Sequence, residues 1–393
     1  MLIINGRIFT MEESLIECGF VRTKGNLIEE VGPMSVLSDK KNEKILDVRG
    51  AWVMPGLIDS HAHIGITEEK WGIIGDDSNE MTNPSTAALR AIDGINPMDP
   101  AFHDAIEAGI TSIMAGPGSA NVIGGQFVFM KTQGRCIDNM IVKYPAAMKI
   151  AFGENPKTTY GNQGQYPSTR MGVAAMLRNT LHKAIQYKCK KERGELSEED
   201  FELEPWIPVL NKEIPLKAHA HRADDILTAI RIAKEFDVNI TIDHGTEGHL
   251  ITDEIKASGY PVIVGTDLTS RSKLEVQNMN FKTCGILQKA GILCAITTDH
   301  PVALIQSLPL CAGLAVKHGL PLEEGLRAIT INAAKICRVD DRVGSLKKGK
   351  DADVVIFSGN PMEIFTKTLY TFSSPDVPTQ ILPSCNIKFP PYL

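Results

Sequence analysis

The 393-residue chain is long enough for one large domain and a smaller one, because single domains commonly hold about 150 residues. Apolar residues make up 43% and charged residues 22%, as in ordinary soluble proteins, which excludes disorder along the whole chain. With 47 acidic and 41 basic residues, the net charge of −6 argues against nucleic acid and other polyanions as partners. The expected partner is a small molecule.

The N-terminal stretch MLIINGRIFTMEE has neither the charged start nor the long apolar run of a signal peptide, and no transmembrane-length apolar run occurs. We therefore expect a cytoplasmic protein without membrane contact. The eight cysteines are scattered and form no CxxC pair, which predicts reduced thiols and argues against a thiolate zinc site. Assembly into a homo-oligomer is left open by these features.

Residues 1–54 predict short strands joined by turns, because their period-two stretches are interrupted by glycine and asparagine. The segment VGSLKKGKDADVVIFSGNP near the other end has the same strand-like stretches interrupted by glycine. We therefore expect a small β-sandwich domain formed by residues 1–54 and 344–393, with a second domain over residues 55–343. The proline-containing tail after Tyr370 interrupts the strand pattern, which leaves the final sandwich strand open.

The middle of the chain alternates strand-like and helix-like segments. Residues 215–219, 238–244, 261–267 and 292–299 read as strands, and 224–236 and 281–290 read as helices. This alternation predicts an α/β fold with a TIM-like (β/α)8 barrel. Two stretches fall outside the pattern: we expect residues 66–100 to form a loop over the site and the charged residues 188–206 to form a solvated excursion.

Metal-ligand residues stand at four of the expected strand ends. His61 and His63 lie two apart, so their side chains share a face of an extended segment. His219, His244 and Asp299 follow three later strands, and the carboxyl ends of barrel strands form the active-site face. Imidazole and carboxylate donors suit Zn²⁺, and Mn²⁺, Fe²⁺ or Co²⁺ are compatible with them. The sequence therefore predicts a metal site.

At these motifs the sequence resembles the amidohydrolase superfamily, and within it the imidazolonepropionase-related amidohydrolases. The resemblance covers nearly the whole chain to about residue 370 and is carried by MPGLIDSHAH, LKAHAHRADDI, TIDHGTEGH, ITTDHP and VGSLKKGKDADVVIFSGNP. It implies metal-dependent hydrolysis of a non-peptide C–N bond in an amide or cyclic amide. It also implies metal ligands from the first, fifth, sixth and eighth barrel strands, namely His61, His63, His219, His244 and Asp299.

Two-metal members of the superfamily add a bridging carboxylated lysine or a glutamate. Lys149 resembles that lysine, and a lysine between two apolar strand residues is costly unless paired or modified. Glu154 is the competing candidate, because it stands nearer the end of the strand. We favour Lys149, and the number of ions, one or two, is left open.

The resemblance also implies roles in catalysis. A bound ion would activate water and polarise the substrate carbonyl, while Asp299 takes the proton of water and passes it to the leaving nitrogen. His249, shortly after the sixth strand, is a candidate to stabilise the oxyanion and contact substrate. His221 shares a face with His219 and is a second candidate for substrate binding. Asp59 is expected to orient a histidine.

Three other functions compete with this reading. A metallo-dipeptidase of Xaa-Pro or Xaa-Arg type would use the same barrel. A deaminase generally needs a glutamate just after the fifth-strand histidine, where this chain has Ala220, His221 and Arg222. A non-catalytic scaffold would have lost ligands, yet all five are present. Substrate specificity depends on loops such as 66–100 and 155–213, and sequence motifs do not reveal what these loops bind.

Overall fold

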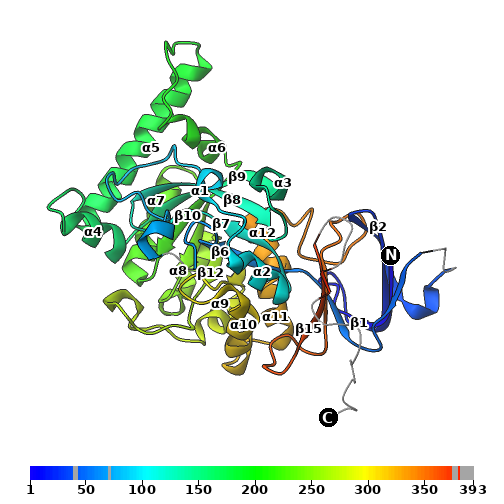
Figure 1. Ribbon diagram of the computed structural model, residues 1–393. Helices are drawn as coiled ribbons and strands as arrows, with labels where there is room; N and C mark the ends of the chain where they lie inside the picture. The colour runs from blue at the N-terminus through cyan, green and yellow to red at the C-terminus, as the bar shows by residue number, and fades with distance from the viewer. Residues whose placement is uncertain (39–42, 70–71, 374–378, 381–393) are drawn as a thin grey trace.

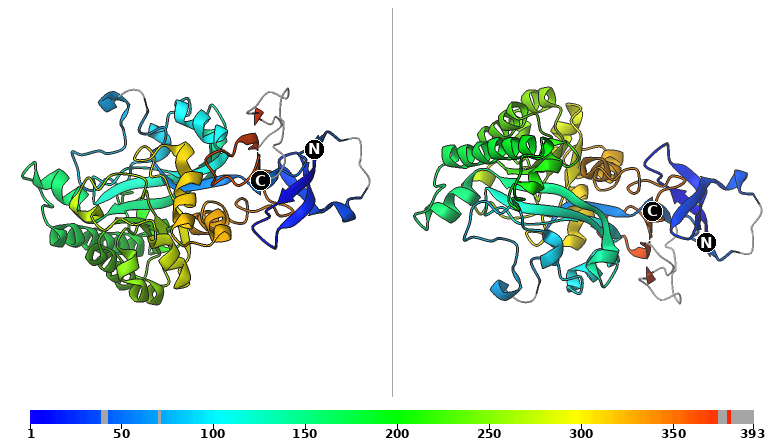
Figure 2. Two further views of the ribbon diagram at one scale, coloured as in Figure 1. Left: turned by 90° about the horizontal axis from the view of Figure 1, so that it is seen from below. Right: turned by 90° about the horizontal axis from the view of Figure 1, so that it is seen from above.

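The computed structural model describes residues 1–38, 43–69, 72–373 and 379–380. A β-sheet contributed by both chain ends stands beside a larger barrel covered by helices (Figures 1 and 2). The predicted fold class, an α/β barrel with a small β domain built from both ends, is confirmed. None of the described helices combines the length and apolar character needed to span a membrane.

The small sheet pairs the first and last segments of the chain. Its strand order is β16-β15-β14-β5-β1-β2-β3, with β4 paired to β1. One half of β1 pairs with β4 and the other half with β5, so the sheet branches and stays continuously hydrogen bonded. The strands are β1 Leu2–Ile8, β2 Ile16–Lys24, β3 Leu27–Pro33, β4 Ile45–Asp47, β5 Trp52–Pro55, β14 Val354–Phe357, β15 Thr368–Phe372 and β16 Thr379–Gln380.

The strand pattern continues past Tyr370 further than the sequence indicated. Tyr370 lies within β15, and the two-residue β16 pairs antiparallel with it. The remainder of the proline-containing tail, and Cys385 within it, lies outside the described residues. Within the described part of the chain all seven cysteines are free thiols, as expected.

The barrel sheet has eight strands in the order β13-β12-β11-β10-β9-β8-β7-β6. The strand β8 runs antiparallel to both neighbours, whereas the other neighbouring pairs are parallel. Residues 116–122 are too few for the crossover that a parallel β7–β8 pair would need, so they form a hairpin. The strands are β6 Leu57–Ala62, β7 Ile110–Ala115, β8 Ile123–Lys131, β9 Ile141–Ala151, β10 Leu216–Ala220, β11 Ile240–His244, β12 Val262–Val264 and β13 Cys294–Ile296.

Helices cover the barrel and extend from it. The α-helices are α1 Ala91–Gly94, α2 Pro100–Glu107, α3 Ile137–Met140, α4 Glu154–Gly161, α5 Arg170–Glu192, α6 Ile207–Leu210, α7 Ala223–Glu235, α8 Thr252–Ser258, α9 Thr283–Lys289, α10 Leu308–Lys317, α11 Leu322–Ala328 and α12 Ile331–Cys337. The 3-10 helices are η1 Met34–Val36, η2 Gly72–Gly75, η3 Glu204–Trp206, η4 Gly248–Leu250, η5 Leu274–Val276 and η6 Ile305–Ser307.

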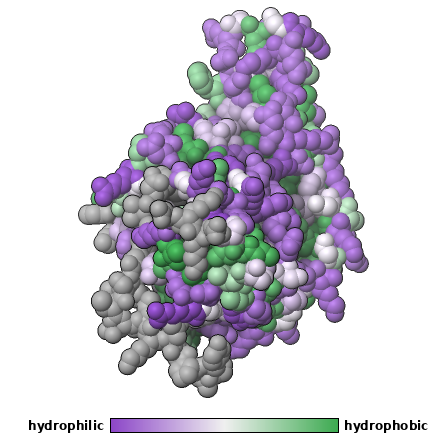
Figure 3. Space-filling view, turned by 90° about the vertical axis from the view of Figure 1, so that its right-hand side faces the viewer, coloured by the Kyte–Doolittle hydropathy of each residue, from purple (hydrophilic) through white to green (hydrophobic). Residues whose placement is uncertain are grey.

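The charged segment 188–206 is only partly the excursion that its composition suggested. It begins inside α5, whose C-terminal end projects from the barrel (Figure 1). Viewed from the side of the small sheet, this projection is mostly hydrophilic, and apolar side chains gather in one central area below it (Figure 3). The segment ends at Trp206, which is fully buried, so its last residue anchors it to the core.

A buried ion cluster connects the barrel to the returning chain. Lys131, the last residue of β8, places its Nζ 2.9 Å from Asp351 Oδ2 and 2.5 Å from Asp353 Oδ2. The last of these carboxylates also accepts a hydrogen bond from Thr111 Oγ1 of β7. All three charged side chains are buried, so the lysine compensates Asp353 and, together with Arg342 at 2.8 Å, Asp351.

We predict that Lys131→Met lowers the free energy of unfolding by roughly 3–5 kcal/mol, because it leaves the buried carboxylate of Asp353 without its cation, whereas Asp351 keeps Arg342. Denaturant unfolding at neutral pH measures this loss. The matched control is Lys347→Met, because Lys347 is exposed and its ammonium pairs with Glu12 at the surface. The control should change stability by less than about 1 kcal/mol. Equal stability of the two variants would contradict a linking role for Lys131.

Candidate active site

A cavity of about 320 Å³ lies at the carboxyl ends of the barrel strands. Its walls include His63, His219, His221, His244 and Asp299. The loop after β6 adds Thr67, Asp76, Ser78 and Asn79, so part of the stretch 66–100 covers the site as expected. The remaining walls carry mainly hydroxyl and amide groups and the ammonium of one lysine, namely Ser119, Asn155, Thr266, Thr269, Ser270, Ser272 and Lys273.

The histidines of β6 both face Asp299. His61 Nε2 lies 3.6 Å and His63 Nε2 lies 3.3 Å from Asp299 Oδ1. The other ring nitrogen of His63, Nδ1, lies 2.7 Å from the carbonyl oxygen of Gly116, which can only accept. His63 therefore carries its proton on Nδ1, and its Nε2 lone pair faces the site.

Asp299 is held in place by Asp59, which lies in β6, the first strand of the barrel. Asp59 accepts hydrogen bonds from the hydroxyl of Thr297 at 2.5 Å, and from the hydroxyl and backbone N–H of Thr298 at 2.5 and 3.0 Å. The expectation that Asp59 orients a histidine ring is wrong, because these bonds and one from the backbone of His61 use its oxygens. Asp59 instead positions the segment that carries Asp299.

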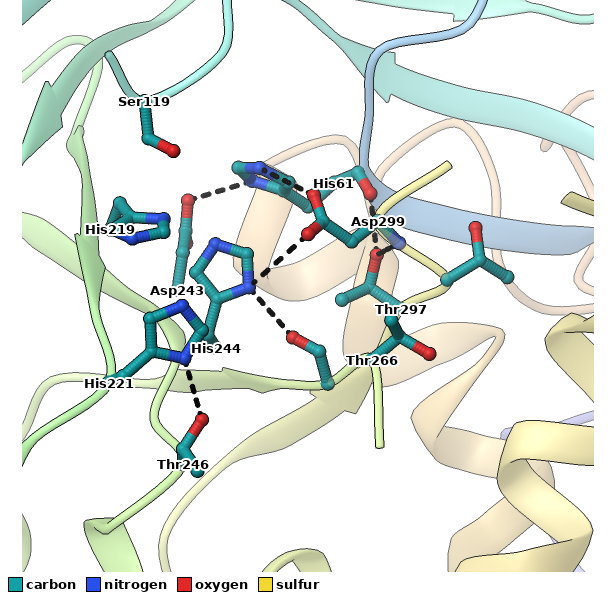
Figure 4. Close-up of polar contacts among 12 residues, drawn as sticks. His61, Ser119, His219, His221, Asp243, His244, Thr246, Thr266, Thr297 and Asp299 are labelled. Carbon is teal, nitrogen blue, oxygen red and sulfur yellow. Dashed lines mark hydrogen bonds and ion pairs between the residues drawn. The ribbon is translucent and has the colours of Figure 1, made fainter. Parts of the chain in front are cut away.

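A second group of histidines lies beside the first. The ligand-type atoms of His219, His221 and His244 lie within 4.8 Å of one another, and Figure 4 shows the three rings gathered together. His244 donates from Nδ1 to Gly265 O at 2.8 Å, and His221 Nδ1 lies 2.8 Å from Thr246 Oγ1. His244 also groups with His61 and Asp299, so it stands between the two sets.

Lys149 and Glu154 end in different places. Lys149, in β9, is fully buried, and its Nζ lies 3.2 Å from His61 Nε2. Burial lowers the pKa of this ammonium to about 8. Glu154 is the first residue of α4 and does not line the cavity. The structure therefore brings Lys149 to the site, and it does not bring the carboxylate of Glu154 there.

His249 is, with Glu154, a predicted site residue that the structure places away from the cavity. It lies in η4, and its Nδ1 is 3.0 Å from Thr283 Oγ1 of α9. It does not line the cavity. The chain turns sharply after β11 at Gly245, where φ is 52°, and this turn takes the following residues away from the site. An oxyanion role for His249 has no geometric support, whereas His221 does line the cavity.

Asp243 and Lys217 belong to the site, although sequence reasoning missed both. Asp243 Oδ2 lies 2.9 Å from His61 Nδ1, as Figure 4 shows, and 3.2 Å from Lys217 Nζ. Lys217 pairs in register with Lys149 across β9 and β10, and both ammonium groups approach the ring of Phe127. The argument that singled out Lys149, a lysine inside an apolar strand, applies equally to Lys217 and could have found it.

The histidines are poised to bind a cation. Burial lowers the pKa values of His61, His219, His221 and His244, so the rings are neutral near pH 7 and each has one nitrogen lone pair that could bind a cation. Burial opposes ionisation of Asp299, yet His244, His63 and His61 hold the pKa of its carboxyl below the usual range.

Unsatisfied polar atoms test whether a metal ion fits here. Within the described residues, His219 Nδ1, His244 Nε2 and Asp299 Oδ1 are buried without a hydrogen-bond partner. Buried polar groups without partners are costly and therefore rare. Neutral imidazoles around an ionised carboxylate form a donor set of the kind that Zn²⁺ and related divalent ions bind. The residues present therefore fit a metal ion.

The chain is similar to known proteins over most of its length. The model of the amidohydrolase family matches residues 211–381. A solved amidohydrolase from Thermotoga maritima MSB8 is 41% identical, with a TM-score of 0.91, and the match covers 94% of this chain and 97% of that one.

More distant relatives extend the comparison. Amidohydrolase tasK from Hapsidospora irregularis is 27% identical over 88% of this chain, which spans 38% of the length of tasK. An imidazolonepropionase from Clostridium tetani is 24% identical, and the match covers 87% of this chain and 85% of the enzyme.

We predict that Asp59→Asn lowers the free energy of unfolding by roughly 2–3 kcal/mol, because its amide NH₂ group must face the backbone N–H of either His61 or Thr298. Thermal unfolding, followed by circular dichroism, measures the loss. The control Thr298→Ser keeps the hydroxyl and should cost about 1 kcal/mol or less. If Asp59→Asn were as stable as the control, Asp59 would not hold this segment.

Proposed function

The chain belongs to the amidohydrolase family, and from this we propose that it hydrolyses a non-peptide C–N bond in a metal-dependent reaction. The proposed substrate is a small amide or cyclic amide, as for the imidazolonepropionase relatives. The observation that carries the proposal is the cavity at the barrel mouth, where neutral histidines surround the ionised carboxylate of Asp299. Four sequence-predicted ligands line it, namely His63, His219, His244 and Asp299, and the fifth, His61, lies 3.6 Å from Asp299.

The proposed chemistry divides between a bound ion and the residues of the chain. When bound, a divalent ion would supply Lewis acidity toward water and the substrate carbonyl. Asp299 borders the cavity as an ionised carboxylate, so it can accept a proton from water and return it to the leaving nitrogen. Asp59 keeps it in place. His221, which also lines the cavity, is the proposed contact for substrate.

Lys149 is the proposed carboxylated residue. Its pKa of about 8 leaves a useful fraction of neutral amine near pH 7.5. A neutral amine adds to carbon dioxide, forming an N–C bond and releasing one proton. The resulting carbamate would place anionic oxygens beside His61, where the ammonium Nζ now lies 3.2 Å from Nε2. This change replaces a buried cation among metal ligands with a buried anion that suits them.

We predict that the purified protein binds a divalent ion and hydrolyses members of a panel of cyclic amides, N-acyl amino acids and dipeptides. Asp299→Asn should lower kcat by roughly 100- to 10,000-fold, because proton transfer is lost. Asp253→Asn, an exposed change on α8, is the matched control and should retain activity. Elemental analysis and product detection provide the measurements.

Each outcome of this panel has a distinct meaning. Hydrolysis of cyclic amides alone supports the proposed substrate class. Activity confined to dipeptides would replace it with a metallo-dipeptidase. Absence of bound metal, together with no activity after addition of Zn²⁺ or Mn²⁺, would overturn the enzyme proposal.

We predict that Lys149→Ala halves the metal content if two ions are bound, because a shared ligand is lost. Elemental analysis of protein purified in the presence of bicarbonate and Zn²⁺ gives the ratio. Glu154→Ala is the control and should leave the ratio unchanged, because Glu154 does not line the cavity. An unchanged ratio in Lys149→Ala would point to a single ion or, if Glu154→Ala lowers the ratio, to Glu154.

A further inference from the structure

Glu275 brings an additional carboxylate to the histidine cluster from outside the barrel strands. It lies in η5, within the long loop after β12, and its side chain is 1% exposed. Its Oε1 lies 3.8 Å from His219 Nε2 and 3.7 Å from His221 Nε2. The residue carries no motif, and neither the barrel pattern nor the ligand spacing pointed to it.

The two oxygens of Glu275 have different surroundings. Oε2 accepts a hydrogen bond from the backbone N–H of Glu154 at 2.9 Å. Oε1 accepts no well-directed hydrogen bond within the described residues, although Lys273 Nζ lies 2.5 Å away as an ion pair. One oxygen is therefore used by the fold, while the other is directed toward two neutral imidazoles.

These distances suit a shared ion. With bond lengths of about 2.0–2.2 Å, neighbouring ligand atoms of a tetrahedral zinc site lie roughly 3.4 Å apart. The separations of 3.7 and 3.8 Å around Glu275 Oε1 are close to this edge. Two of the nitrogens required are available, because His221 and His244 make their hydrogen bonds through Nδ1 and keep Nε2 free. Figure 4 shows these two rings beside His219.

We propose that Glu275 is the fourth ligand of a metal position formed with His219, His221 and His244, an inference that rests on the proposed metal-dependent function and makes His221 a metal ligand instead of a substrate contact. A second position, formed by His61, His63 and Asp299, lies beside it at the cavity. With the shared Lys149 carbamate the first position would have five protein ligands and the second four, so the second keeps more room for water or substrate. The Glu275 position would then hold an ion that supports the site, and the Asp299 position would carry the chemistry.

Lys273 competes with a metal ion for the same oxygen. Its Nζ contacts both Glu275 Oε1 and Asn155 Oδ1, the latter at 2.9 Å, and its side chain lines the cavity. An ion that binds Glu275 must displace this ammonium, because two cations cannot share one oxygen at contact distance. Removal of the lysine charge should therefore strengthen metal binding, and removal of the carboxylate should weaken it.

Metal titration of chelator-treated protein tests the proposal. Zn²⁺ and Co²⁺ are titrated into wild type and Glu275→Gln in competition with a chromophoric chelator. In the variant, the amide oxygen can still accept from Glu154 N–H, while the NH₂ group cannot bind a metal. We expect the affinity for one equivalent of metal ion to fall by more than roughly 10- to 100-fold, the loss typical when a residue that only hydrogen-bonds to a metal ligand is replaced. Lys273→Met, the matched variant, should bind this equivalent at least as tightly as wild type.

The outcomes separate the two proposals. If wild type binds no divalent ion, the metal-dependent function fails. If wild type binds and Glu275→Gln binds with the same affinity and stoichiometry, only the role of Glu275 is overturned. A crystal structure of the wild type soaked with Zn²⁺ gives an answer without a variant. An ion within about 2.2 Å of Glu275 Oε1 supports the proposal. Bound ions in a structure where Oε1 still pairs with Lys273 Nζ overturn it.

Discussion

The hydrogen bonds of Asp59 are the constraint on which the rest of the site depends. They connect β6, the first barrel strand, to Thr297 and Thr298 just after β13, the last one. Because the same carboxylate joins both edges of the barrel sheet, His61 and Asp299 meet, although 238 positions separate them along the chain. The carboxylate is fully buried, so it has no solvent to compete with these donors, and its geometry is well defined.

A balance of buried charges surrounds this connection. Lys149 and Lys217 lie side by side beneath the histidines, and Asp243 and Asp299 compensate them. Such groups are stable inside a protein only when each one is paired or changes its ionisation state. The site is therefore strongly polar at the centre of an apolar barrel, and this makes it able to accept a cation. The lowered pKa values of the histidines follow from the same burial.

Sequence and structure agree best where a side chain belongs to a barrel strand. His61, His63, His219, His244 and Asp299 were predicted from their places at strand ends. The structure brings four of them to one cavity, and His61 lies buried behind its wall, 3.6 Å from Asp299. The antiparallel direction of β8 was not predicted, because alternation along the chain does not reveal a connection too short for a crossover. His249 was misplaced because its position depends on the turn at Gly245, which the strand period does not describe.

The amino-acid sequence by itself determined the barrel, the small sheet of both chain ends and the ligands on the strands, because hydrophobic periodicity places strand residues on definite faces. Only the tertiary structure decided between Lys149 and Glu154, replaced the expected partner of Asp59 and revealed Asp243, Lys217 and Glu275. These contacts join distant segments, and Glu275 arrives on a loop without periodicity. Their geometry depends on how strands and loops pack in three dimensions, which local sequence patterns do not encode.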